Sequence, residues 1–438
     1  MNKILCHSAL ALAFVATLGG CSEKAKFQPA QQSGGDPTLP KSQNFLVPPM
    51  QVPDKAGWKQ GQTPTVAAGL KIERIAGDLK HPRQLYVLPN DDVLVVEANG
   101  PGTEPVTTPK QLLAGMVKSK SGKGGKGGNQ ITLLRRKGAA GDWEKHVFIK
   151  NLNSPFGVQL IGDSLYVANT DGIVKFPYVT GETEITAPGT SFADLPGTIN
   201  HHWTKALLAS PDGRKLYVGV GSNSNITEND LAVEYRRADI LEVDVATGAS
   251  RIYASGIRNP TGLQWEPQTG KLWAIANERD EIGADLVPDY LTSVQEGGFY
   301  GWPYSYYGQH VDTRVMPQRP DLVAKALKPD YAIGSHVAPL GLLISDKVLP
   351  QKYHGGAFIS EHGSWDRSPL SGYQVVHVAF AQGKPVGIPE PVVTGFYSKD
   401  ESQLYGAPVG LVVDNEGALL IADDVGNTVW RVTSVANN

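Results

Sequence analysis

The stretch HHWTKALLASPDGRKLYVGVGSNSN, residues 201–225, decides the fold. Two apolar runs, 206–209 and 216–220, flank the tripeptide Pro211-Asp212-Gly213. Pro, Asp and Gly at adjacent positions favour a tight turn, and short apolar runs on both sides of such a turn are typical of paired antiparallel strands. The stretch therefore predicts a β-hairpin with polar residues at both of its ends.

The same pattern of turn, strand, polar turn and strand recurs along the chain. It appears again at 81–100, 154–172, 258–281, 336–363 and 407–432. Six such units predict an all-β protein, a six-bladed β-propeller in which each four-stranded blade packs on its neighbours. A seven-bladed propeller with one degenerate blade and a pair of β-sandwiches remain as alternatives. In a propeller, the residues at the ends of the inner strands converge on the central axis.

Composition agrees with many short strands. The 438 residues include 49 Gly and 31 Pro, and only 19% are charged, against a usual value of about 25%. With a net charge of −3, the chain lacks the excess of basic residues that is typical of nucleic-acid-binding proteins. Both cysteines, Cys6 and Cys21, lie in the first 21 residues, which excludes a disulfide framework or a cysteine zinc site from the body.

The N-terminus has the pattern of an export signal. Lys3 precedes an apolar run at 8–18 that is too short for a comfortable membrane span. The following Leu-Gly-Gly-Cys, which ends at Cys21, resembles a bacterial lipoprotein signal. We therefore expect a signal peptide at 1–20, a lipidated Cys21, a disordered tether over 21–65 and the propeller over 66–438. This predicts a cell-envelope protein that meets the membrane only through a lipid; the alternative is a plain secretory peptide.

Two segments fall outside the repeat. Residues 101–130 contain VKSKSGKGGKGGNQ, which lacks the final Lys-Ser/Thr of a phosphate loop and opens no obvious helix. We expect a solvated, mobile insertion there. Residues 282–335 are rich in Tyr and Pro and predict a long insertion over one face.

Polar residues at the strand ends are the candidates for chemistry. His202 could act as a general base because the pKa of histidine lies near neutrality. Arg258 and Asn259 could clamp an anionic ligand, and the oxygen-rich turn 277–281 suits Ca²⁺. The segment 361–367 places a His, a Trp and an Arg in one candidate pocket wall. Each feature has a structural alternative: a turn-capping His, a surface Arg, a solvated acidic turn and an aromatic contact between blades.

Several of these motifs resemble one known family. SGIRNPTGLQWEPQTGKLWAIANERDE and EGGFYGWPY look like the glucose/sorbosone dehydrogenases, and the 201–225 stretch, HVAPLGL and EHGSWDRSPLSGYQVV are similar to the L-sorbosone dehydrogenase branch. The resemblance covers about residues 70–435. It implies a six-bladed propeller that uses pyrroloquinoline quinone (PQQ) and Ca²⁺ to oxidise a sugar.

The resemblance also implies roles for individual residues. His202 matches the base that takes a hydroxyl proton, and Arg258 and Asn259 match the pair that holds the cofactor. The turn Glu278-Arg279-Asp280 matches the calcium turn, which uses main-chain carbonyls as well as a side chain. The resemblance further implies that PQQ is contacted by three residues of the fifth unit: His336, His362 and Arg367. His336 and His362 are also the next candidates for the base.

The chain departs from the family pattern at a few positions. Ser222 stands where an acidic residue is expected, and His362 stands where the family has a lysine. Ala407 replaces an arginine before Pro-Val-Gly, and the Gly/Lys insertion replaces a substrate-contacting segment. We therefore expect a PQQ- and calcium-dependent dehydrogenase of an aldose, sorbosone or related sugar, which passes electrons to an external acceptor. The alternatives are a lipid-tethered propeller that binds without the cofactor and a calcium-dependent lactonase.

Overall fold

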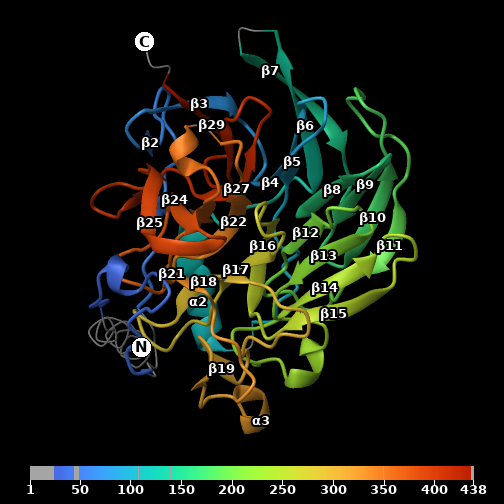
Figure 1. Ribbon diagram of the computed structural model, residues 1–438. Coiled ribbons are helices and arrows are strands. Elements are labelled where there is room, and N and C mark those ends of the chain that lie inside the picture. Colours follow the sequence, from blue (N-terminus) through green and yellow to red (C-terminus); the bar gives the residue numbers. More distant parts are fainter. Residues whose placement is uncertain (1–23, 44–48, 107, 139–140, 349, 436–438) are drawn as a thin grey trace, which may run out of the picture.

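The computed structural model describes residues 24–43, 49–106, 108–138, 141–348 and 350–435. Six antiparallel sheets follow one another around a common centre (Figure 1). Each begins with the inner strand of one repeat unit, so the predicted all-β, six-bladed propeller is confirmed. The signal peptide and Cys21 lie outside the described residues.

The blades follow the chain in order. Blade one contains β4 (Pro82–Val87), β5 (Val93–Glu97), β6 (Gln130–Lys137) and β7 (Asp142–Ile149). Blade two contains β8 (Gly157–Ile161), β9 (Ser164–Ala168), β10 (Gly172–Pro177) and β11 (Thr190–Asp194). Blade three contains β12 (Lys205–Ala209), β13 (Lys215–Val220), β14 (Asp239–Asp244) and β15 (Ser250–Ser255). Blade four contains β16 (Asn259–Trp265), β17 (Leu272–Asn277), β18 (Pro288–Ser293) and β21 (Tyr331–Ser335).

The last two blades recruit strands from the N-terminal part of the chain. Blade five contains β22 (Pro339–Ile344), β23 (Ala357–Glu361), β24 (Gln374–Ala381), β25 (Lys384–Thr394) and β2 (Thr65–Val66). Blade six contains β27 (Pro408–Val413), β28 (Leu419–Asp423), β29 (Thr428–Ser434) and β3 (Leu70–Ala76). The remaining elements are short: β1 (Asp54–Lys55), β19 (Ser305–Tyr306), β20 (His310–Val311), β26 (Gln403–Leu404), α2 (Pro109–Lys120), α3 (Pro320–Val323), η2 (Pro29–Gln31), η3 (Leu231–Glu234) and η4 (Gln351–Tyr353).

The turn between β12 and β13 shows why the repeat folds as hairpins. Asp212 accepts hydrogen bonds from the Ser210 hydroxyl at 2.6 Å and from the Arg214 amide at 3.1 Å. Gly213 has φ of +69°, a conformation that glycine adopts without steric cost. The turn therefore reverses the chain and sets the register in which Lys205 pairs with Val220.

Strand β3 closes the ring. It precedes the first blade in sequence but pairs antiparallel with β29 of the last one. Ile75 and Leu79 pack with Val429, Leu420 and Val93 in one buried cluster that joins blades one and six. Because a strand that precedes the first blade shares a sheet with the last blade, separation of these blades exposes this apolar cluster.

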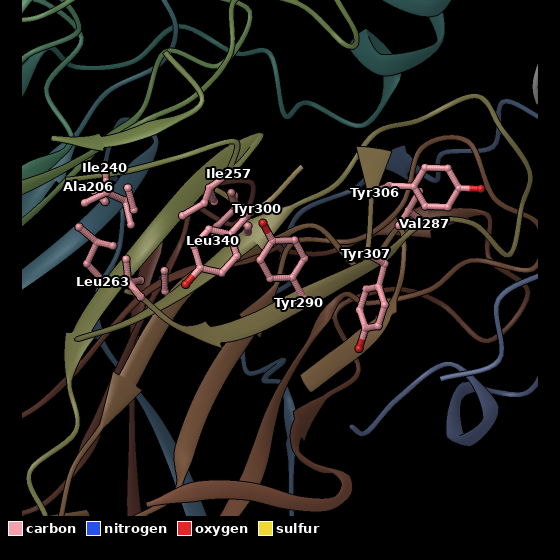
Figure 2. Packing of buried hydrophobic residues seen from close by; sticks show 14 of the residues in the cluster. Ala206, Ile240, Ile257, Leu263, Val287, Tyr290, Tyr300, Tyr306, Tyr307 and Leu340 are labelled. Atoms are coloured by element: carbon pink, nitrogen blue, oxygen red, sulfur yellow. The ribbon is translucent and has the colours of Figure 1, made fainter. Parts of the chain in front are cut away.

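The largest buried cluster lies between blades three and four. Figure 2 shows Ile257 and Tyr300 in this cluster together with Tyr290 and Leu340. Burial of such large side chains provides most of the favourable free energy of folding. The same cluster extends under the loops that follow β17, so the core supports the side of the propeller where the candidate residues lie.

The two ends of the propeller axis differ. At one end the strands are joined by short turns, such as 210–214 and 266–271. At the other end lie the connections 98–129, 221–238 and 278–287. We call this end the mouth face. His202, Arg258 and His336 precede inner strands there, so the convergence predicted from the repeat places them at the same end.

The described part of the predicted tether is ordered on the propeller, which corrects that prediction. Gln32 is buried and donates to the Asp285 carbonyl at 2.7 Å, and the buried Ser33 donates to the Ile333 carbonyl at 3.0 Å. β1 also pairs with β26. A polar composition is typical of a disordered segment. Here, however, the polar groups form hydrogen bonds with residues of blades four to six. Among the described residues, no helix has the length and apolarity needed to span a membrane.

Candidate active site

A cavity of about 300 Å³ opens on the mouth face. Most of its wall comes from residues that precede an inner strand or that end or follow the second strand of a blade. The lining side chains that can carry charge are Glu104, Lys118, His201, His202, Arg258, Glu278, Asp280, Asp289, His336 and Asp366. Trp365 and Ser364 complete the wall. This concentration of buried charge in one hollow is typical of functional sites.

His202 has the geometry of a neutral base. Its Nδ1 lies 3.0 Å from the Ser222 carbonyl oxygen and 2.9 Å from the Ser222 hydroxyl. An Nδ1–H that donates to this carbonyl leaves the lone pair on Nε2. Burial, followed by the charge of Arg258, holds the pKa of His202 well below its usual value, so the imidazole is neutral at pH 7.

Arg258 is the buried cation of the cavity. The side chain is 2% exposed and is fixed by Asn225 and by the Glu278 carbonyl, which accepts from Nη1 at 2.7 Å. Each terminal nitrogen carries a second N–H that can reach a ligand. Asn259 lies behind it; its Nδ2 donates to Asn277, while its buried Oδ1 has no hydrogen-bond partner.

The three side chains of the turn 278–280 make different contacts. Arg279 and Glu278 form a buried ion pair at 3.1 Å, and Arg279 also contacts Asp312 at 3.1 Å. The Arg279 side chain is therefore committed to these two carboxylates, and a guanidinium cannot ligate a cation. Glu278 and Asp280 both line the cavity. The candidate metal ligands of this turn are therefore the Asp280 side chain and main-chain carbonyl oxygens.

Asp280, His336 and Asp366 form a cluster that lines the same cavity as His202. Nδ1 of His336 lies 3.4 Å from Asp280 and 3.2 Å from Asp366, and its Nε2 donates to the Gly283 carbonyl at 2.9 Å. Although burial opposes it, the two carboxylates raise the pKa of His336 to about 10. His336 is thus a cation at neutral pH and a poor candidate for the base. The three ligand atoms could also hold a metal ion.

His362 and Arg367 lie beside the cavity and do not line it. Nε2 of His362 is 3.0 Å from both carboxylate oxygens of Asp424. Arg367 donates to the Ala284 carbonyl and to Asp285, and it lines a separate cavity of about 410 Å³ beneath residues 25–33. Glu361 is the only other acidic or basic lining residue of that larger cavity, so the smaller one is the candidate active site.

The described part of the Gly/Lys insertion, 101–106 and 108–130, is ordered and contains helix α2, which corrects the prediction of a mobile loop. The Thr108 hydroxyl oxygen accepts a hydrogen bond from the Gln111 amide at 3.2 Å, and the Gln111 side-chain oxygen accepts one from the Thr108 amide at 3.0 Å. This capping box, with Pro109 at the first helical position, starts the helix. A Cβ at Gly127 would lie 2.1 Å from the Asn99 amide nitrogen, so glycine there permits close packing.

The insertion covers one side of the cavity. The ammonium of Lys118 lies 3.8 Å from the centre of the Trp365 ring. Lys123 donates to the carbonyls of His362 and Gly363 at 2.7 and 2.9 Å, and burial lowers its pKa to about 7. Glu104 contacts His201. A segment of blade one is thus fixed to the wall contributed by blade five.

His201 and His202 both line the cavity. Two neighbouring residues of a strand would instead point to opposite faces. β12 begins only at Lys205, and the two imidazole rings meet edge to face at 4.5 Å. The irregular backbone before the strand allows both side chains to face the same hollow.

Sequence reasoning missed the residues that other segments bring to the site. Lys118, Glu104 and Asp366 all line the cavity. Asp366 could have been predicted as a site residue, because it stands between Trp365 and Arg367 in the candidate pocket wall 361–367. The signal for Lys118 is that residues 105–129 contain five lysines and no acidic residue.

The lining residues fit both groups that the sequence implies. Asp366 is 2% exposed, and its Oδ1 accepts no hydrogen bond but lies 3.2 Å from Nδ1 of His336. With Asp280 it offers the oxygen ligands that Ca²⁺ prefers. The positive charges of Arg258, Lys118 and His336 face the cavity and suit the carboxylates of an anionic quinone. Cationic and anionic groups lie on the same wall, as a joint site for a metal and an anion requires.

Comparison with known proteins supports this architecture. A protein of Borreliella burgdorferi described as uncharacterized is 26% identical over 299 residues, which cover 66% of this chain and 77% of that protein. A protein of Hypocrea jecorina described as a pyrroloquinoline quinone-dependent sugar dehydrogenase is 21% identical over 338 residues, which cover 66% of this chain and 75% of that protein.

Solved structures share the fold. The iodide structure of the family AA12 enzyme from Trichoderma reesei has a TM-score of 0.69 at 19% identity, covering 90% of this chain and all of that one. The holo form of the pyranose dehydrogenase PQQ domain from Coprinopsis cinerea has a TM-score of 0.68 at 19% identity, covering 87% of this chain and all of that one. The TrAA12-like family matches residues 64–296 and 320–435, most of the propeller, and the chain therefore belongs to this family.

Proposed function

We propose that this protein is a PQQ- and calcium-dependent dehydrogenase that oxidises an aldose, sorbosone or related sugar. The observation that carries the proposal is one cavity that is lined by a neutral histidine, His202, by a buried arginine and by the Asp280–His336–Asp366 cluster. The similarity to a Hypocrea jecorina protein described as a PQQ-dependent sugar dehydrogenase supports it.

In such an oxidation, one residue of the protein accepts a proton and others bind the cofactor. Nε2 of His202 accepts the hydroxyl proton of the substrate, since Nδ1–H is held by the Ser222 carbonyl. When bound, the quinone supplies an acceptor for the two electrons and the hydrogen released from carbon. Arg258 would bind a quinone carboxylate with its free N–H groups, and Lys118 would add a second positive charge from the insertion.

The calcium ion would sit against the carboxylates of Asp280 and Asp366. Both oxygens belong to one cluster whose ligand atoms lie within 4.8 Å of one another. Main-chain carbonyls of the 278–280 turn are further candidate ligands. A divalent cation there offsets the repulsion between two buried carboxylates and places positive charge beside the cofactor.

Reconstitution tests the proposal directly. PQQ is added to purified, EDTA-treated protein with and without Ca²⁺, and bound quinone is followed by its absorbance while sugars and an artificial electron acceptor are supplied. We expect quinone binding and turnover only when Ca²⁺ is present. Turnover that is unaffected by complete metal removal would contradict the calcium site, and absence of quinone binding under all conditions would contradict the enzyme.

A second function is favoured by the acidic side of the cavity. Five carboxyl side chains line it: Glu104, Glu278, Asp280, Asp289 and Asp366. Ala407 also leaves blade six without the cation found in the resembled family. A propeller that binds a divalent cation or a sugar without the quinone matches this charge, and the absorbance measurement separates the two functions.

We further propose that the protein acts in the cell envelope, anchored by a lipid on Cys21, with its electrons leaving to an external acceptor. The Leu-Gly-Gly-Cys motif supports this. One acyl chain binds a membrane only marginally, so stable anchoring needs more than one. Labelled palmitate should enter the wild type and be absent from Cys21→Ala, and equal labelling of the two would contradict the anchor.

A further inference from the structure

Helix α2 presents an apolar stripe to solvent. Leu112 is 56% exposed, Leu113 39% and Met116 54%. The three lie on adjacent turns of one helix, because residues three and four apart are neighbours on a helical surface. Single exposed apolar residues are ordinary, but a group of three on one helix face needs a reason.

The stripe lies in the most basic part of the chain. Residues 105–129 contain five lysines and no acidic residue, in a chain whose net charge is −3. Lys120 is exposed at the C-terminal end of α2, and Lys126 is exposed in the loop that follows. A helix that combines exposed apolar side chains with lysines is typical of segments that lie on a membrane surface.

The first described segment of the chain begins close to the same face. The Ala25 amide donates to the Ser368 carbonyl at 2.8 Å, and Ser368 follows the cavity residues Trp365 and Asp366 by two to three positions. Cys21 precedes Ala25 by four residues, which span at most about 14 Å when extended. A lipid on Cys21 would therefore hold the mouth face near the bilayer.

We infer that the mouth face of this propeller is seated on an anionic membrane surface through the exposed stripe of α2 and its lysines. The apolar side chains enter the interface between headgroups and acyl chains, and the lysines contact anionic headgroups. The cavity then opens toward the membrane interface. Attachment of the insertion to the propeller wall, through Lys118 and Lys123, keeps the stripe directed outward.

Lipid quenching of a fluorescent label shows which face meets the membrane. Met116→Cys and Ala246→Cys are labelled separately in the full chain; Ala246 is exposed in the turn between β14 and β15, at the opposite end of the axis. The proteins are bound to vesicles of phosphatidylglycerol and phosphatidylcholine that carry a spin-labelled lipid. We expect strong quenching at 116 and none at 246. Equal quenching at the two positions overturns the inference.

Charge and apolar contributions are tested separately. Lys120→Gln should weaken binding to the anionic vesicles about fivefold, the factor that corresponds to about 1 kcal/mol per surface lysine. Lys271→Gln, an exposed lysine in the turn before β17 at the opposite end, is the matched control and should have no effect. Leu112→Ser with Met116→Ser should reduce binding further, while activity with a soluble acceptor stays unchanged.

Two outcomes contradict the inference in different ways. If vesicle-bound protein shows no quenching at 116, the lysine face meets another partner, such as an acidic protein, and the membrane assignment is wrong. If quenching at 116 is as strong on pure phosphatidylcholine and Lys120→Gln binds normally, anionic lipid is not the determinant. Neither result depends on whether the cavity binds PQQ, so failure of the proposed function is recorded independently.

Discussion

His202 and His336 are both buried in one cavity, yet their surroundings give them opposite charges. His202 faces a backbone carbonyl and a neighbouring guanidinium, and its pKa lies well below the usual value. His336 faces two carboxylates, and its pKa rises to about 10. Burial alone favours the neutral form in both cases, so the neighbouring charges decide. One histidine can accept a proton at neutral pH and the other is already protonated.

The largest effect is expected from removal of the neutral histidine. His202→Asn keeps the shape of the wall but loses the proton acceptor, so turnover should fall by a factor of about 10²–10⁴ while bound quinone is retained. Steady-state kinetics with the reconstituted protein, together with quinone absorbance, measures the two separately. Arg258→Ala should show the reverse pattern, with weaker quinone binding.

Ser222→Ala is the control for His202. It removes the hydroxyl at 2.9 Å from Nδ1 but keeps the carbonyl at 3.0 Å. Turnover should then remain close to that of the wild type. If Ser222→Ala and His202→Asn cost the same, the base lies elsewhere and the division between the two histidines fails.

Removal of the charged histidine should affect stability before chemistry. In metal-free protein, His336→Gln removes the positive charge that contacts both Asp280 and Asp366, although Arg258 still lies 3.8 Å from Asp280. This loss should lower the free energy of unfolding by roughly 3–5 kcal/mol. Urea unfolding measures it. Added Ca²⁺ should recover part of the loss, because both carboxylates remain. If the double variant His336→Gln, Asp366→Asn is no more stable than His336→Gln, the repulsion is not the cause.

The stability of metal-free protein should depend on pH with opposite slopes for the two histidines. Below pH 6.5, His202 becomes protonated in the unfolded chain but stays neutral in the folded protein. The free energy of unfolding therefore falls as the pH falls. Between pH 6.5 and about 10, folded His336 keeps a proton that the unfolded chain loses, so stability falls as pH rises.

Each slope is at most about 1.4 kcal/mol per pH unit for one proton. Urea unfolding at a series of pH values should show a flatter acid side for His202→Asn and a flatter alkaline side for His336→Gln. Profiles parallel to that of the wild type in both variants would mean that other groups dominate the titration.

The sequence predicts the part of the site that local chemistry determines. The Asp212-Gly213 turn and its relatives mark the hairpins, and strand ends in a closed repeat must converge, which brings His202, Arg258 and His336 together. The charge of His336 was not predictable in the same way. It depends on Asp366, which reaches it from another loop at 3.2 Å.

The insertion and the N-terminal segment show where local composition misleads. Glycine and lysine in 101–130 look solvated, but Lys123 is held by carbonyls of His362 and Gly363, about 240 residues away. Gln32 likewise donates a hydrogen bond to the Asp285 carbonyl, which is distant in the sequence. Polar segments become ordered when a distant surface supplies their hydrogen-bond partners, and a sequence read locally does not contain that surface.

The smallest effect is expected at His201, which extends the comparison to a third histidine in the cavity. Its side chain is 23% exposed and contacts Glu104, whose side chain is 38% exposed. Solvent screens such a pair, and exposed ion pairs contribute about 1 kcal/mol or less. His201→Asn should therefore change kcat/KM by less than about fivefold, and Glu104→Gln should do the same.

The double variant His201→Asn, Glu104→Gln decides whether the two residues act as one contact. If the pair only fixes the insertion at the cavity rim, the double variant costs no more than either single change, because the second substitution has no contact left to remove. The loss should appear in KM, since Lys118 lies on the same insertion and faces the ligand. If His201→Asn instead lowers kcat as much as His202→Asn while Glu104→Gln does not, His201 is the proton acceptor. The neutral state of His202 would then be a structural consequence of its burial.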